Sequence, residues 1–174
     1  MIKDEFDYVC EIPSDINEHL PVLRDLASEC LHITEMGVRG IVSTWAFMEG
    51  LKGRSGTLIG IDILPPNFYG GDLPQVYEYA KAEGVNFKFI LGSTLDLTID
   101  ETDLIFVDTL HEYKQLKEEL ALHSDKARKY IVLHDTTSCR EELWPAIREL
   151  LSKKVWQVKY EYPFNNGVTV FERC

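Results

Sequence analysis

The feature that most constrains this chain is the alternation of short apolar segments with helical segments along almost its whole length. Five apolar segments, each ending in a polar residue or running into glycine, predict buried strands at 32–36, 56–62, 86–91, 103–108 and 130–135. Helical spacing and helix-terminating residues predict helices at 20–30, 43–51, 72–84, 112–127 and 141–151. Two last segments, 155–160 and 168–172, flank the turn residues Asn165-Asn166-Gly167 and predict an antiparallel pair.

Nearly continuous apolar strands separated by helices indicate a parallel sheet that is covered on both faces. We therefore expect the α/β class, as a Rossmann-like three-layer αβα sandwich. Its sheet should be mostly parallel and seven-stranded, with an antiparallel C-terminal hairpin at one edge. The 174 residues are enough for one core, so we expect a single domain over residues 1–174.

Composition narrows the classes of function. The net charge of −11 repels nucleic-acid phosphates, so a nucleic-acid partner is not expected. No apolar run reaches the length of about 20 residues that a membrane helix needs, and no signal peptide is visible, so we expect a cytoplasmic protein with no membrane partner. The four cysteines form no C-x-x-C pair, which predicts reduced structural thiols; they are Cys10, Cys30, Cys139 and Cys174.

The first candidate site is the turn after the first strand, which spans residues 35–44. Gly37 and Gly40 allow a tight turn and a close approach of the backbone to a ligand. The helix that follows presents free N–H groups to a carboxylate or a phosphate. Glu35 beside the turn suits a cationic group of the ligand, such as an ammonium, and disfavours a pyrophosphate.

Two further strand ends point to a nucleoside ligand. Asp62 ends the second strand, where a carboxylate can accept hydrogen bonds from both hydroxyls of a ribose. Ser93 and Thr94 follow the third strand and could line a flat base such as adenine, although an ordinary loop explains them equally well. These features do not separate a nicotinamide cofactor from S-adenosylmethionine.

The fourth and fifth strands end in residues that suit metal binding or proton transfer. Asp108 closes one strand and His111 follows three residues later, while His134 and Asp135 close the other strand. If these strands are neighbours, two carboxylates and an imidazole come together, which suits a divalent cation such as Mg²⁺ or Mn²⁺. A metal-free polar cluster is an equal alternative. Adjacent strand residues face opposite ways, so His134 and Asp135 can both face Asp108 only if the strand has already broken.

Together these motifs resemble those of class I S-adenosylmethionine-dependent methyltransferases. The order E-x-G-x-x-G, strand-end Asp, apolar-D-x-x-H-x-Y and L-H-D-T over residues 31–136 is most similar to a particular subgroup. This subgroup contains the cephalosporin-hydroxylase-like proteins and the metal-dependent sugar O-methyltransferases. The resemblance implies an enzyme that transfers methyl groups from S-adenosylmethionine to a hydroxyl of a small molecule or glycan.

The resemblance also implies roles for individual residues. Cofactor contacts are expected from Glu35, Gly37, Val38, Arg39, Gly40, Ser43, Asp62, Ser93, Thr94 and Asp108. His111, with Asp108, matches the catalytic residues, and His111 would act as general base. Asp108, His134 and Asp135 would hold Mg²⁺ or another divalent cation.

The chain also departs from the subgroup. His134 stands where metal-dependent members tend to have an acidic residue, and Thr109 replaces the usual glycine. The chain lacks the additional N-terminal segments that often form a substrate lid, so its pocket could be open, completed by a second subunit of a homo-oligomer, or lost. Two other functions therefore stay open, namely a non-catalytic nucleoside-binding protein of the same fold and a nicotinamide-dependent oxidoreductase.

Overall fold

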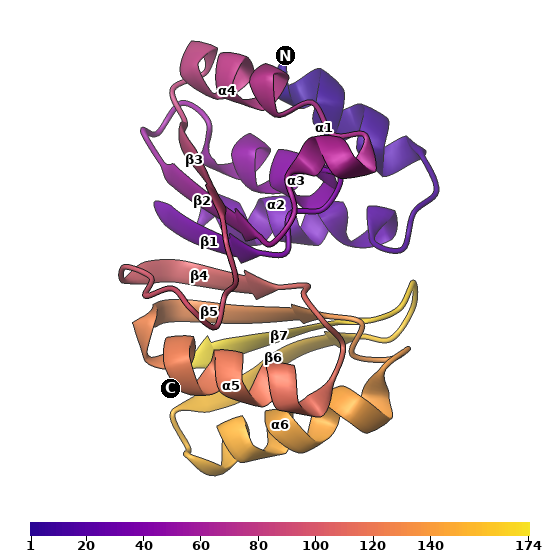
Figure 1. Cartoon of the computed structure of the whole chain (residues 1–174), viewed down its shortest axis with the longest axis vertical. Helices are drawn as coiled ribbons and strands as arrows, with labels where there is room; N and C mark the ends of the chain where they lie inside the picture. Colours follow the sequence, from indigo (N-terminus) through magenta and orange to yellow (C-terminus); the bar gives the residue numbers. More distant parts are fainter.

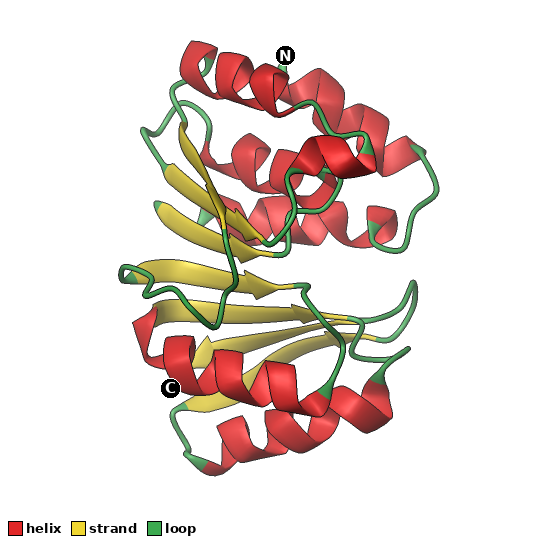
Figure 2. Ribbon diagram, in the orientation of Figure 1, coloured by secondary structure: helices red, strands yellow, loops and turns green.

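The computed structural model describes residues 1–174 and contains one seven-stranded sheet with helices on both faces (Figures 1 and 2). The strands are β1 (His32–Met36), β2 (Thr57–Asp62), β3 (Asn86–Leu91), β4 (Thr102–Val107), β5 (Ala127–His134), β6 (Trp156–Tyr162) and β7 (Val168–Arg173). The helices are α1 (Ile2–Glu11), α2 (Leu20–Ser28), α3 (Val42–Leu51), α4 (Leu73–Ala82), α5 (Tyr113–His123) and α6 (Arg140–Ser152). Short 3₁₀ turns lie at Asn17–His19, Pro66–Tyr69 and Ser124–Lys126.

The strand order is β3-β2-β1-β4-β5-β7-β6. Strand β7 runs in the direction opposite to that of the other six strands. The order reverses between β1 and β4, which are adjacent in the sheet and parallel. A ligand site of an open α/β sheet lies beyond the carboxyl ends of the strands at such a reversal. The predicted fold class is confirmed, including the C-terminal hairpin.

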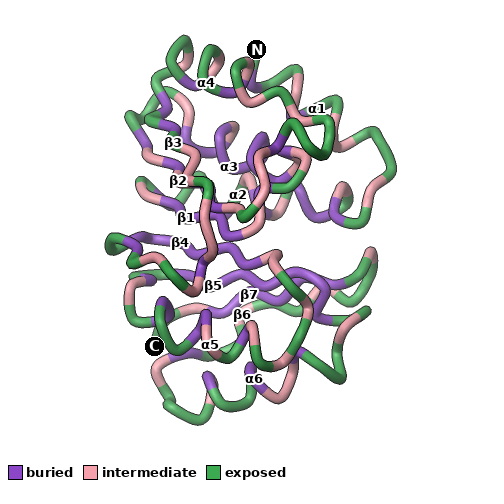
Figure 3. Tube along the Cα trace, in the orientation of Figure 1, coloured by how far each residue is buried: buried purple, intermediate pink, exposed green.

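Each face of the sheet has its own apolar core (Figure 3). Along β4, Leu104 and Phe106 belong to the core under α1 to α4, whereas Ile105 and Val107 belong to the core under α5 and α6. Successive strand residues point to opposite faces, so a strand that is covered on both faces is apolar at most of its positions. This is why the nearly continuous apolar segments of the sequence are the central strands.

The structure differs from the sequence prediction at three places. Helix α1 was not predicted; its Ile2 and Phe6 are buried against α2 and α3, and its acidic exposed face hid this pattern. Helix α5 ends at His123, and β5 begins at Ala127, earlier than expected. Asp108 lies just beyond the end of β4. No helix combines the length and apolar character required to cross a membrane.

The turn after β1 packs directly against the end of β4. Gly37 has φ of +88°, and a Cβ atom at this position would lie 1.9 Å from the carbonyl oxygen of Asp108. Gly53 also has a positive φ, +70°, but a Cβ atom there would meet nothing within 4 Å. Substitution of Gly53 by alanine would therefore introduce backbone strain alone, whereas substitution of Gly37 would add a steric clash.

We predict that Gly37→Ala lowers the free energy of unfolding by about 2–5 kcal/mol, because left-handed strain and overpacking add. Gly53→Ala carries the strain alone and should cost about 1–2 kcal/mol. Urea unfolding of both variants provides the comparison. Equal losses in the two variants would show that the contact between Gly37 and Asp108 does not constrain the fold.

Candidate functional site

Two adjoining cavities lie beyond the carboxyl ends of β1, β2, β3 and β4. The first has a volume of about 410 Å³ and the second about 430 Å³, which suits a small organic ligand. They share the lining residues Gly37, Arg39, Tyr69 and Asp108. The structure thus brings the predicted residues of the first, second, third and fourth strand ends to one place.

The turn between β1 and α3 is held by a carboxylate from the neighbouring strand. Asp62 Oδ2 accepts hydrogen bonds from the backbone N–H groups of Val38 at 2.9 Å and Arg39 at 2.8 Å, and Oδ1 accepts one from Leu64 at 2.9 Å. A carboxylate offers about four lone-pair sites, so roughly one is free for a ligand. The sequence analysis allowed both hydroxyls of a ribose, whereas the structure leaves space for one without disturbing the turn.

Glycine at positions 37 and 40 suggests a left-handed backbone at both, but only Gly37 has one. Gly37 is left-handed, but the next left-handed residues are Arg39 at φ of +45° and Ile41 at +70°, rather than Gly40. A β-branched residue in this region is strained. Gly40 instead lies near Tyr69 in the wall of the first cavity. The close hydrogen bonds to Asp62 help to hold this strained backbone.

Glu35 lies beneath the turn rather than in either cavity. It is fully buried, and its carboxyl accepts hydrogen bonds from Ser43 Oγ at 2.5 Å and Thr44 Oγ1 at 2.8 Å in the first turn of α3. Burial raises the pKa of Glu35 to about 8, and the two hydroxyls only partly oppose this shift. Glu35 therefore fixes the start of α3, and Ser43 is the residue of this pair that lines a cavity.

A buried polar network supports the second cavity. Glu119 on α5 accepts hydrogen bonds from Thr94 at 2.5 Å, Thr109 at 2.8 Å and Gln115 at 2.8 Å. Thr94, Thr109 and Gln115 line the cavity together with Ser93, whereas Glu119 lies behind them. The sequence analysis missed Gln115 and Glu119. Their spacing of four residues on one helical face was the available signal, but nothing in the sequence showed which strand end this face meets.

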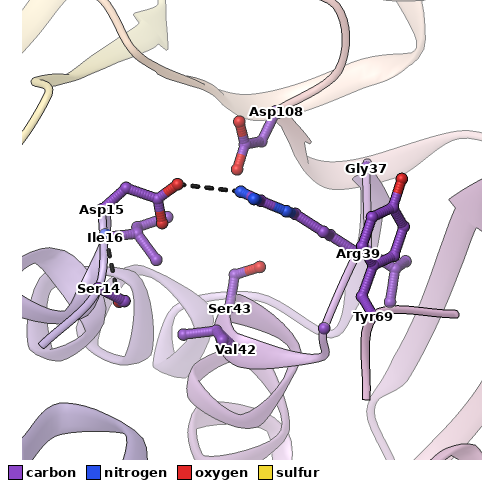
Figure 4. Close-up of a pocket in the computed structure, with 11 residues that line it drawn as sticks. Ser14, Asp15, Ile16, Gly37, Arg39, Val42, Ser43, Tyr69 and Asp108 are labelled. Atoms are coloured by element: carbon purple, nitrogen blue, oxygen red, sulfur yellow. Dashed lines mark hydrogen bonds and ion pairs between the residues drawn. The ribbon is translucent and has the colours of Figure 1, made fainter. Parts of the chain in front are cut away.

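The first cavity is closed on one side by the segment that precedes α2 (Figure 4). The guanidinium of Arg39 extends across the cavity, 3.1 Å from Asp15 and over the ring of Tyr69. Ser14 and Ile16 complete this side. The sequence analysis identified no site residue in the N-terminal segment, because it carries no motif and reaches the sheet edge only through the packing of α1 and α2.

Four predicted residues form a cluster where β4 and β5 end. His111 Nε2 lies 3.2 Å from Asp108 Oδ1 and 3.0 Å from Asp135 Oδ2. His134 Nδ1 lies 3.2 Å and 2.9 Å from the same two oxygens. Strand β5 ends at His134, and Asp135 has φ of +57°. This break lets consecutive residues face Asp108, which is the condition that the sequence analysis set.

The charges in this cluster shift one another's pKa. The carboxylates of Asp108 and Asp135 raise the pKa of His111 to about 10. Burial lowers the pKa of His134, but the same two carboxylates outweigh burial and raise it to about 10. Burial disfavours the charged form of both carboxylates, yet the histidines hold their pKa values below the usual range. Asp108 also faces both cavities, so the cluster adjoins the ligand site.

Comparison with known proteins gives the class of fold. No protein-family model and no curated protein sequence matches the chain. Solved structures do match it over most of its length. The methyltransferase PaMTH1 of Podospora anserina, bound to S-adenosylhomocysteine, has a TM-score of 0.71 at 15% identity, over 99% of this chain and 87% of that protein.

Two other structures agree. The O-methyltransferase TomG of Streptomyces achromogenes, in complex with S-adenosylmethionine, has a TM-score of 0.71 at 16% identity, covering 93% of this chain and 81% of that one. A putative caffeoyl-CoA O-methyltransferase of Staphylococcus aureus has a TM-score of 0.68 at 14% identity, covering 98% and 90%. The fold is that of class I S-adenosylmethionine-dependent methyltransferases.

The burial of Glu35 predicts a specific pH dependence of stability. Because its pKa is about 8 in the folded protein against an ordinary value of 4.5, folding favours the neutral carboxyl. Its contribution to stability is present below pH 4.5 and is lost as the pH rises from about 4.5 to 8. We expect Glu35→Gln to become progressively more stable than the wild type over this interval.

Urea unfolding at several pH values measures this difference. Glu78→Gln on the exposed side of α4 is a matched control and should show no such trend. A difference between Glu35→Gln and wild type that stays constant with pH would contradict the neutral state of Glu35.

Proposed function

We propose that this chain is an S-adenosylmethionine-dependent methyltransferase that acts on a hydroxyl group of a small molecule or sugar. The observation that carries this proposal is the pair of adjoining cavities on either side of Gly37 and Asp108. S-adenosylmethionine consists of a nucleoside and an amino-acid group joined at one sulfur atom, so it needs two connected spaces of this kind. The match of the fold to methyltransferases of known structure supports the same reading.

In this proposal the adenosine part occupies the second cavity. Asp62 would accept a hydrogen bond from one ribose hydroxyl, and Ser93, Thr94 and Gln115 would surround the adenine. The Nε2 group of Gln115 already donates to Glu119, so its carbonyl oxygen is free to accept from the amino group of adenine. Glu119 would be a positioning residue behind this contact.

The methionine part would occupy the first cavity. The start of α3 and the side chain of Ser43 offer hydrogen-bond donors to its carboxylate. Arg39 carries a positive charge into the same space and can leave Asp15 to pair with that carboxylate. Glu35 would act only through Ser43 and α3, and not by direct contact with the cofactor as the sequence analysis expected.

We predict that Asp62→Ala binds S-adenosylmethionine about ten- to a hundred-fold more weakly, because it removes a charged hydrogen-bond acceptor. Asp103→Ala is the matched control. Asp103 also accepts backbone N–H groups, from Leu31 and His32, but it lines neither cavity. Calorimetry with S-adenosylmethionine and with NAD should show the loss for Asp62→Ala alone and weak binding of NAD. Tighter binding of NAD would favour the oxidoreductase instead.

The cluster at the ends of β4 and β5 fits a divalent cation. The side chain of His134 is fully buried, and its Nδ1 atom has no hydrogen-bond partner although it lies close to both carboxylates. An unpaired buried nitrogen is costly unless something binds it. Asp108, His134 and Asp135 would hold the ion. When bound, it would orient an acceptor hydroxyl and lower the pKa of that hydroxyl.

His111 is the proposed general base. Its side chain is partly exposed, whereas that of His134, which contacts the same two carboxylates, is buried. With a pKa of about 10 it holds a proton at neutral pH, because it is paired with both carboxylates. A second positive charge between Asp108 and Asp135 would release this proton and leave the imidazole free to accept one from the acceptor hydroxyl.

We predict that His111→Ala lowers turnover by roughly a hundred- to ten-thousand-fold once an acceptor is identified, because a general base is lost. Affinity for S-adenosylmethionine should stay nearly unchanged, since His111 lines neither of the two cavities. Steady-state kinetics and calorimetry on the same preparation measure the two effects. Turnover within a few-fold of wild type would mean that positioning alone drives the reaction.

A non-catalytic nucleoside-binding protein is the alternative within this fold. It would bind S-adenosylmethionine with the same dependence on Asp62, but His111→Ala would have no reaction to affect. The proposal also includes three expectations from the sequence. The acceptor is a hydroxylated small molecule or glycan, the protein forms a homo-oligomer, and it is located in the cytoplasm. Screening hydroxylated small molecules and glycans for methyl transfer from labelled S-adenosylmethionine distinguishes the enzyme from the binding protein.

A further inference from the structure

The cluster beside the cavities contains more nitrogen donors than a site built for Mg²⁺ requires. Besides the carboxylates of Asp108 and Asp135, it contains the imidazoles of His111 and His134. The thiol of Cys139 lies within 4.8 Å of the ligand atoms of His111 and Asp135. Mg²⁺ prefers oxygen ligands and water, whereas imidazole and thiolate ligands favour first-row transition ions.

The orientation of His134 makes Nδ1 the ring nitrogen that faces the two carboxylates. Its Nε2 atom lies 2.9 Å from the backbone carbonyl oxygen of Asp15 and donates to it, so Nδ1 is the atom that would bind an ion and give up its proton on binding. Histidine ligands of metals commonly make this kind of second contact, which fixes the tautomer and the ring orientation. The sheet and the N-terminal segment together therefore aim the Nδ1 atom of His134 at the carboxylates.

The spacing of the donor atoms fits a common ion. His134 Nδ1 lies 2.9 Å from Asp135 Oδ2 and 3.2 Å from Asp108 Oδ1. Ligand atoms bonded to one ion at about 2.0–2.2 Å lie about 3–3.5 Å apart at octahedral or tetrahedral angles. Nδ1 has no hydrogen-bond partner, and the ligand atoms of the three residues all lie within 4.8 Å of one another.

We propose that Asp108, His134 and Asp135 form a site for a first-row transition ion such as Zn²⁺ or Fe²⁺ in preference to Mg²⁺, and that His134 sets this preference. This inference rests on the proposed function for its location beside the cofactor cavities. The two claims can be tested separately, because binding of S-adenosylmethionine in the second cavity does not depend on which ion the cluster selects.

The test compares ion affinities in the wild type and in His134→Glu, with Zn²⁺ and Mg²⁺ as the probes in calorimetry. Loss of a nitrogen ligand should weaken Zn²⁺ binding by about ten- to a hundred-fold, by analogy with changes around other metal sites. Mg²⁺ affinity should stay equal or rise, because a carboxylate replaces the imidazole. His32→Gln, which removes an imidazole outside the cluster, is the control and should leave both affinities unchanged.

A second measurement needs no substitution in the cluster. Pulsed electron paramagnetic resonance of the wild type loaded with Cu²⁺ should show coupling to the ¹⁴N of a bound imidazole. This coupling should be retained in His32→Gln. If His134→Glu does not fold, this spectrum decides between a nitrogen ligand and oxygen ligands alone.

Three outcomes would overturn the inference: no ion binds, the ratio of Zn²⁺ to Mg²⁺ affinity is the same in His134→Glu, or the ¹⁴N coupling is absent. Calorimetry with S-adenosylmethionine on the same wild-type preparation tests the proposed function separately. Cofactor binding with no ion preference would overturn only the inference, while ion selection without cofactor binding would overturn only the proposed function.

Discussion

The contact between the turn after β1 and the end of β4 is the constraint on which the rest of the site depends. At Gly37 the two backbones come so close that no side chain fits, and both cavities meet at this point. Asp62 holds the same turn from the β2 side through backbone N–H groups. The position of the cavity walls therefore follows largely from how four neighbouring strands end, and residues 14–16 and Gln115 of α5 complete them.

Burial of charge is the second physical theme of the site. Glu35, Glu119, His134 and Asp135 are buried at one edge of the sheet, while Asp108 and His111 are partly exposed, and the charges are compensated differently in each case. Hydroxyls compensate Glu35 only partly, so its carboxyl is neutral over much of the physiological range. Hydroxyls and an amide satisfy Glu119, whereas opposite charges satisfy the cluster. Only the cluster places several donor atoms around one point, which is why it alone suits an ion.

The N-terminal segment has a larger role than its sequence indicates. Asp15 contributes its side chain to Arg39 and its backbone carbonyl to His134, and so connects the first cavity to the cluster. A ligand that draws Arg39 away from Asp15 would act on the same residue that orients His134. This connection joins the proposed cofactor site and the proposed ion site through one short segment.

The sequence by itself determined the central strands, their succession along the chain and the polar residues at their ends, whereas the order of the strands in the sheet came from the structure. Buried parallel strands are largely apolar, and this pattern is local enough to recognise at β1, β2, β4 and β5 although Glu35 interrupts it in β1. Only the tertiary structure decided that Asp62 supports the turn, that Glu35 lies behind it, and that Gln115 and Asp15 reach the cavities. These roles depend on contacts between residues far apart in the chain, and on the left-handed backbone at Asp135, which the period of a strand does not encode.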